Sequence, residues 1–278
     1  MYIKSQQQHR EFLQQMVSLK LWFTAKWKYE NPQESIEDII GNRTLIRNYT
    51  SFNNSDLNAD ISAIEGSADW VGVVNCLSDL YHKMKPRGDY ELYEKAAFSL
   101  LESSIEDRIE RDLHVFNTDY NSDESRSGSC FFFVNEVDNS PEAKYLANNF
   151  GNGQHFMRCH QWNNRYPESY LAEPEIFRRC LINLIDDTES CGAIGIYGTG
   201  WMNLFPVFSR QFPPEWRRNA IGPIYDIRGN LGCWGQFICP DYSFQHKTAD
   251  RYRRTHIIPY PSTLCFATAT DFRNFFAN

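Results

Sequence analysis

The spacing of the apolar residues changes about half-way along the chain, and this change constrains the fold more than any other feature of the sequence. Between residues 70 and 113 apolar residues recur every three or four positions, which is the period of an amphipathic helix. From Cys130 onward short apolar runs alternate with helical stretches. We therefore expect an α+β protein with a helical N-terminal half packed on a mostly antiparallel, strand-rich C-terminal half.

The same patterns place individual elements along the chain. Helices are predicted at residues 5–23, about 33–40, 70–84, 92–113, 140–150 and 173–186. The helix at 92–113 is expected to bury Leu92 and Leu100 together with its other apolar residues. Lys26-Trp27-Lys28-Tyr29 alternates polar and aromatic residues, which favours a short strand. Further strands are expected at 130–134, 154–160, 192–197, 204–208, 223–227, 233–238, 255–258 and 263–267.

The length of 278 residues suits one large domain or two small ones. We expect a single α+β domain over residues 1–278 with an acidic helical insert at about 65–116. The net charge of −7 is unevenly distributed, because residues 30–140 contain 22 acidic and nine basic groups. Residues 141–278 contain fourteen basic groups, of which twelve are arginine. With 42% hydrophobic residues the chain is not expected to be disordered.

No apolar run approaches the roughly 20 residues of a membrane helix, and the first residues are polar, so we expect a cytoplasmic protein without a membrane partner. The eight cysteines are irregularly spaced and are interpreted as reduced. His155, Cys159 and His160 cluster in the sequence, but no C-x-x-C pair accompanies them. We therefore predict no metal site.

Two stretches resemble a widespread bacterial family of unknown function. That family has a Y-x-Y-R strand, a short helix and an F-N-D-P-F-D loop, then a C-F-S-E strand and an M-W-x-x-Y-A-x-x-H-x-G helix. The matching residues here are 27–30, 36–40, 45–46 and 52–56 for the first part, and 135–136, 140, 145–151 and 156–160 for the second. The opening layout also looks like that of ADP-ribosyltransferase-like toxins and DNA-modifying enzymes.

The resemblance implies a diverged ADP-ribosyltransferase-like protein, acting on NAD or another nucleotide-type small molecule, with a role as a toxin or phage-defence effector. It implies NAD as a substrate. An enzyme of this kind needs a carboxylate that stabilises positive charge at the ribose, together with arginines and aromatic rings that hold the ligand. The candidate acid is Glu136, and the candidate ligand contacts are Tyr29, Arg43, Arg47, Phe52 and Tyr145.

Several positions depart from the family pattern, and they support an alternative function. Glu30 stands where the family has arginine, and Asn54-Ser55 replaces its Asp-Pro pair. The family's C-terminal W-x-x-E-x-E-x-R element is matched best by residues 247–256, which contain neither glutamate. The alternative is a non-catalytic binding or immunity protein whose acidic helical face contacts a protein partner. A nucleic-acid surface around Arg217-Arg218 and residues 251–254 ranks below the nucleotide-ligand function, because the acidic helices would repel nucleic acid.

Overall fold

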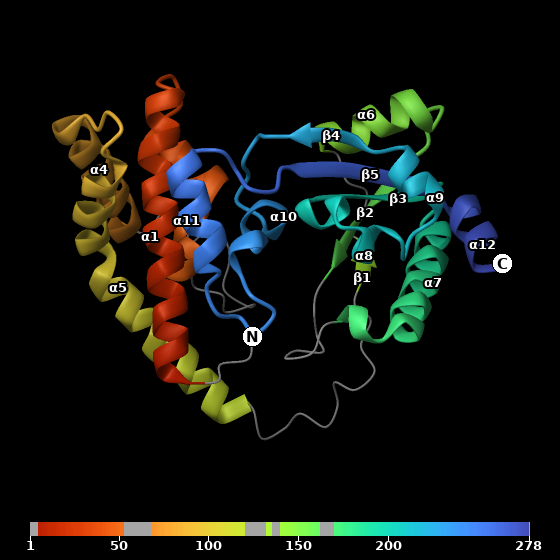
Figure 1. Ribbon diagram of the computed structural model, residues 1–278, viewed down its shortest axis with the longest axis horizontal. Helices are drawn as coiled ribbons and strands as arrows, with labels where there is room; N and C mark the ends of the chain where they lie inside the picture. The colour runs from red at the N-terminus through yellow and green to blue at the C-terminus, as the bar shows by residue number, and fades with distance from the viewer. Residues whose placement is uncertain (1–4, 53–67, 120–131, 135–139, 162–169, 278) are drawn as a thin grey trace. The chain divides into compact units, whose positions relative to one another are not determined.

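The computed structural model describes residues 5–52, 68–119, 132–134, 140–161 and 170–277 (Figure 1). Contacts between Cα atoms group the chain into two compact units. The first comprises Met1–Asp123, Ile227–Asn230 and Phe237–Thr255, and the second comprises Glu124–Asp226, Leu231–Gln236 and His256–Asn278. The two units are interleaved along the chain.

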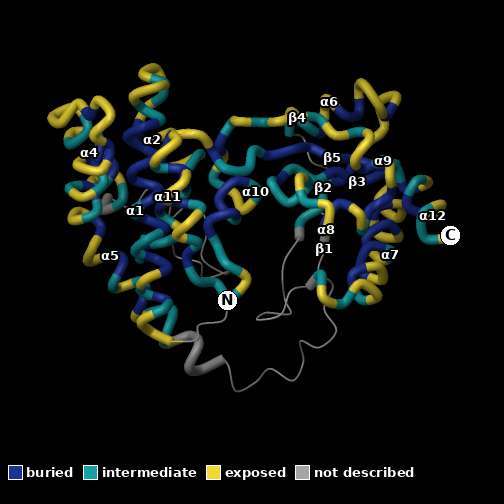
Figure 2. The backbone as a smooth tube through the Cα atoms, in the orientation of Figure 1, coloured by how far each residue is buried: buried dark blue, intermediate teal, exposed yellow. Residues whose placement is uncertain are grey.

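The first unit is helical. Its elements are α1 (Gln6–Glu30), α2 (Ile36–Asp38), the π-helical turn η1 (Ile39–Thr44), the 3-10 turn η2 (Ile46–Tyr49), α4 (Ala68–Met84), α5 (Tyr90–Asp119) and α11 (His246–Thr255). Helix α1 begins at Ser5, whose hydroxyl caps the helix by accepting a hydrogen bond from the Gln8 amide at 3.1 Å. Buried residues run along α1 from Phe12 to Ala25 (Figure 2). This helix is therefore the central element of the unit, and α5 packs along it.

Aromatic rings join the helices of the first unit. The ring of Trp22 is fully buried and lies 5.9 Å from Tyr90 at the start of α5 and 5.2 Å from Tyr252 on α11. Rings in these edge-to-face positions stabilise a core beyond the area that they bury. A C-terminal helix thus completes the core of the N-terminal helices.

Ion pairs between helices neutralise part of the acidic segment. Arg10 on α1 pairs with Glu106 on α5 at 2.9 Å, and Arg253 on α11 pairs with Glu94 at 2.9 Å. The side chain of Asp112 accepts hydrogen bonds from His9 at 2.9 Å and from Arg108 at 2.7 Å. The carboxylates of Glu94 and Asp112 are therefore mostly buried within the unit, whereas Glu106 is partly exposed.

The second unit contains the sheet. Its strands are β1 (Phe132–Val134), β2 (Phe156–Gln161), β3 (Gly195–Gly200), β4 (Ile221–Ile224) and β5 (Ser262–Thr268), in the order β1-β2-β3-β5-β4. Among the strands that the structure describes, β2 and β3 pair in parallel, and the other three pairs are antiparallel. The α+β class and the mostly antiparallel sheet are therefore confirmed.

Helices cover the two faces of this sheet unequally (Figure 1). One face packs against α7 (Pro174–Ser190), α8 (Pro206–Ser209), α9 (Pro214–Arg218) and α12 (Ala269–Ala277), which contribute Phe177, Phe208, Trp216 and Phe272. The opposite face packs against α6 (Pro141–Phe150), which contributes Ala143 and Leu146. The remaining short elements of the sheet half are η4 (Tyr170–Ala172), η5 (Trp201–Leu204), α10 (Leu231–Trp234) and η6 (Gly235–Phe237).

Some predicted elements are wrong. The strand expected at residues 26–29 is the last turn of α1, because the helix continues to Glu30 before Asn31-Pro32 ends it. Residues 204–208 include the start of α8, and residues 255–258 contain no strand. Residues 233–237 form helical turns, and Ile238 forms an isolated β-bridge with Phe244. Short apolar runs of this kind fit a buried helical turn as well as a strand, so periodicity alone does not separate them. No helix within the described ranges is long and apolar enough to cross a membrane.

Candidate functional site

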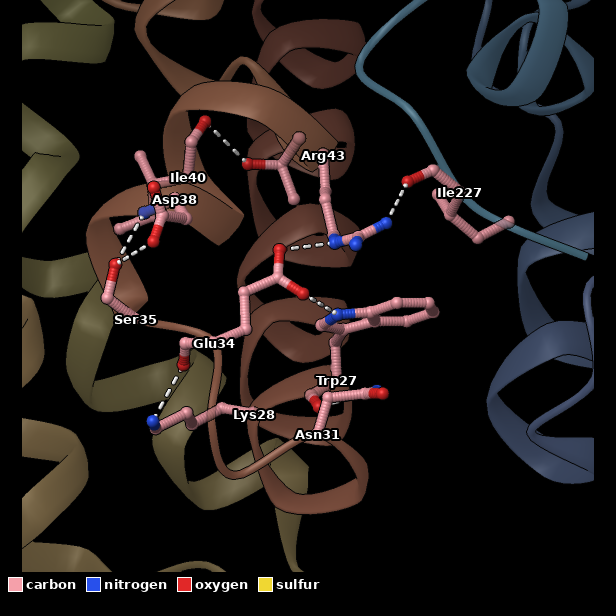
Figure 3. A network of polar contacts seen from close by, with 10 residues as sticks. Trp27, Lys28, Asn31, Glu34, Ser35, Asp38, Ile40, Arg43 and Ile227 are labelled. Carbon is pink, nitrogen blue, oxygen red and sulfur yellow. Dashed lines mark hydrogen bonds and ion pairs between the residues drawn. The ribbon is translucent and has the colours of Figure 1, made fainter. Parts of the chain in front are cut away.

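The predicted ligand contact Arg43 lies on η1, in a network with the end of α1 (Figure 3). Its guanidinium stacks on the Trp27 ring, 4.3 Å from the ring centroid, and forms an ion pair with Glu34. The other oxygen of Glu34 accepts a hydrogen bond from Trp27 Nε1 at 2.9 Å. The three side chains satisfy one another, and the arginine is about four-fifths buried.

The same arginine binds a segment from the far end of the sequence (Figure 3). Arg43 Nη1 donates to the Ile227 carbonyl at 3.0 Å, and the Gly229 amide donates to the Asn42 carbonyl at 2.9 Å. A Cβ atom at Gly229 would lie 2.4 Å from Cγ of Leu45, so only glycine fits this close approach. Arg43 therefore attaches residues 227–230 to the first unit, and its donors are used inside the protein.

Tyr29 lies away from this network because its segment is helical. Successive residues of an α-helix are rotated by about 100°, so Trp27 and Tyr29 point about 200° apart, whereas in a strand they would share a face. The Tyr29 ring lies 6.2 Å from Tyr90 and is half exposed. The two predicted contacts Tyr29 and Arg43 are therefore on different sides of α1.

Arg47 and Phe52 lie at the start of the loop that resembles the family's ligand loop. Here this segment is held against α5, since the Ser51 amide donates to the Ser104 carbonyl at 2.8 Å and Arg108 donates to the Asn48 carbonyl at 3.1 Å. Phe52 packs 5.3 Å from the ring of Trp70. Arg47 is half-buried and makes no side-chain hydrogen bond or salt bridge to any residue that the structure describes.

Tyr145 and Glu136 belong to the other half of the resemblance. Tyr145 is on α6 in the second unit, half exposed, with its ring 6.1 Å from Phe150. Glu136 lies outside the described residues. The ligand contacts predicted from the first half of the resemblance thus fall in one compact unit, and Tyr145 falls in the other.

Helix α5 carries a surface that the sequence pattern misassigned. Leu92 and Leu100 were expected to be buried, but they are 60% and 46% exposed. Because Tyr93, Ala97 and Leu101 form the buried face, Leu92 and Leu100 lie outside it. The leucines stand in adjacent apolar pairs, Leu92-Tyr93 and Leu100-Leu101. Either member of such a pair can lie on the buried face of a helix, so spacing alone did not decide which face is buried.

Cysteines and metal-ligating side chains form no site among the residues described. No group of three or more His, Cys, Asp or Glu residues there could hold a metal ion, and the seven described cysteines are free thiols. Burial raises the pKa of the Cys265 thiol to about 12. This thiol is therefore a core side chain rather than a nucleophile.

Comparisons of the chain with protein-family models, with curated proteins and with solved structures found no match.

Proposed function

We propose that this protein is a non-catalytic binding protein that takes a basic, amphipathic helix of a protein partner on the outer face of α5. The observation that carries the proposal is the exposure of Leu92 and Leu100 on a face that continues into carboxylates that form no salt bridge with a described residue. Exposed apolar surface bordered by charge is typical of protein interaction sites.

Residues spaced three or four positions apart form one continuous face of α5. Positions 92, 96, 100, 103, 107 and 110 are separated by three or four residues, so they lie in one line along the helix. The line begins with Leu92, Ala96 and Leu100 and ends with Asp107 and Glu110. An amphipathic helix with leucines at the same spacing and lysines or arginines toward one end would complement both parts.

The acidic end of this face remains available to a partner, whereas three other acids of α5 already bind basic residues. Glu94, Glu106 and Asp112 bind basic residues within the first unit. Asp107 and Glu110 are exposed and make no salt bridge among the residues described. They supply the negative potential that would orient a basic partner and speed its association.

The geometry gives less support to the transferase-like function that the resemblance implies. Arg43 donates to Glu34 and Ile227 inside the protein, and Tyr29 points to a different side of α1. A ligand contact should instead have donors left for the ligand. That the protein binds NAD and turns it over stays a prediction, and incubation with NAD tests it separately.

The docking surface can be tested with a synthetic peptide of about 18 residues, built from leucine and lysine at helical spacing. We expect the purified protein to bind this peptide in fluorescence anisotropy, and to bind it less tightly as salt rises. The double variant Leu92→Ser/Leu100→Ser should bind at least about tenfold more weakly. Leu204→Ser/Val207→Ser, which changes two other exposed apolar residues in the second unit, is the matched control.

Equal binding by the wild type and the α5 variant would contradict the proposal, as would equal binding of a scrambled peptide with the same composition. The enzymatic function is tested in parallel by incubation with millimolar NAD. A binding protein of the proposed kind should release no nicotinamide.

A further inference from the structure

One face of the sheet in the second unit carries a polar patch inside an otherwise apolar surface. Arg158 on β2 lies opposite Tyr197 on β3 in the parallel register. Side chains alternate along a strand, so His160 and Thr199, each two residues further on, lie on the same face. These four residues form a two-by-two block of polar groups.

The block adjoins a buried apolar cluster. Phe156, Leu264 and Phe266 share this face and are 1%, 3% and 3% exposed. The hydroxyl groups of Tyr197 and Ser140 are 3.1 Å apart, and Ser140 also caps α6 by accepting from the Ala143 amide. Tyr197 is thereby fixed in place, and its buried ring forms one side of the patch.

Arg158 is the unusual member of the block. Its side chain is half-buried on an interior strand, yet it makes no hydrogen bond or salt bridge with any residue that the structure describes. A guanidinium is charged at every physiological pH, and arginine is rarely withdrawn from solvent unless it is paired. Thr199 is also half-buried, and its hydroxyl has no partner in the described part of the chain.

We propose that Arg158 and Thr199 bind the phosphate group of a small molecule on this face of the sheet, with His160 beside it. The planar fork of the guanidinium can donate to two oxygens of one anion. The threonine hydroxyl supplies a donor for a third oxygen, which a phosphate has and a carboxylate lacks. This site lies in the second unit and is independent of the surface proposed on α5.

Inorganic phosphate is the probe for this site. The melting temperature of the full chain is followed as phosphate is raised to about 50 mM, with sodium chloride and sodium acetate series at the same ionic strength. A ligand that binds the native state raises stability in proportion to the logarithm of its concentration above Kd. We expect phosphate to raise the melting temperature more than chloride or acetate does.

The variants identify the residues. Arg158→Gln should weaken phosphate binding at least about tenfold in calorimetric titration, because it removes a charged, bidentate donor. Arg179→Gln, an exposed arginine on α7 of the same unit, is the matched control and should bind like the wild type. If Arg158→Gln does not fold, Thr199→Val keeps the arginine and the volume of the side chain, and it should bind phosphate several-fold more weakly.

Three results would overturn the proposal. The first is a phosphate effect no larger than that of chloride, which would mean that Arg158 only extends toward solvent. The second is equal stabilisation by acetate, which would remove the preference for phosphate. The third is unchanged phosphate affinity in a folded Arg158→Gln or Thr199→Val variant.

Discussion

At the scale of single residues, the environment of an arginine separates a structural role from a binding role. Arg43, Arg47 and Arg158 look alike in the sequence, because each stands near aromatic or hydroxyl residues. Arg43 is stacked on Trp27 and paired, whereas Arg47 and Arg158 have no polar partner among the described residues. The predicted contact Arg43 is therefore better explained as part of the folded framework.

This difference predicts the effect of removing each side chain. Arg43→Ala should lower the free energy of unfolding by about 1.5–3 kcal/mol, since it breaks a charged hydrogen bond and removes a donor from one oxygen of Glu34 and from the Ile227 carbonyl. Arg47→Ala should change it by no more than about 0.5 kcal/mol. Urea unfolding followed by tryptophan fluorescence measures both values. An equally small decrease in the free energy of unfolding in both variants would show that the contacts of Arg43 with Glu34 contribute no net stability.

At the scale of elements, polar contacts fix how α1 and α5 pack. Burial raises the pKa of the Asp112 carboxyl, but hydrogen bonds from His9 and Arg108 outweigh burial and hold it below its ordinary value of 3.8. The folded state thus binds the ionised form more favourably than the unfolded state does. This stabilisation is present above the unfolded pKa and is lost as the pH falls through the lower, folded pKa.

Asp112→Asn tests this contact through its pH dependence. At pH 7 the variant should be less stable than the wild type by about 1.5–3 kcal/mol, because the amide carries no negative charge and its nitrogen cannot accept a hydrogen bond. The difference should shrink as the pH falls below about 4, where the wild-type carboxylate is itself protonated. Denaturant midpoints measured between pH 7 and pH 3 give the comparison. A difference that stays constant over this range would assign the loss to packing instead of charge.

At the scale of the whole molecule, residues far apart in the sequence complete each compact unit. Tyr252 on α11 packs against Trp22 and Phe23 on α1, about 230 positions earlier in the chain. Arg43 attaches residues 227–230 to the same unit. The helical core therefore depends on the C-terminal part of the chain as well as on the N-terminal helices.

Because the helical core depends on α11, a substitution in α11 should affect α1, which lies far away in the sequence. Tyr252→Ala should destabilise the first unit by about 3 kcal/mol or more, because it leaves a cavity beside a fully buried tryptophan. Amide hydrogen exchange in residues 20–24 of α1 should then speed up by about two orders of magnitude. Arg254→Ala, on the exposed side of the same helix, should leave this exchange unchanged. Slow exchange in both variants would mean that α1 keeps its stability without α11.

The sequence alone determined the features that depend on local chemistry. Helical periodicity located α4 and α5, and the Ser-Pro-Glu signal located the start of α6 with Ser140 as its cap. The change of spacing near residue 130 indicated the α+β class. These features follow from interactions between residues a few positions apart, which a linear pattern records.

Only the tertiary structure decided what depends on distant neighbours. The choice between strand and helix at Trp27 and Tyr29, and the exposed face of α5, were set by which partners cover each side chain. The pairing of Arg43 with Glu34 and Ile227 was decided in the same way, as was the lack of such a partner for Arg158 among the described residues. Burial and charge compensation are properties of the surroundings in three dimensions, so the same residue type acts as a framework contact in one place and as a candidate binding group in another.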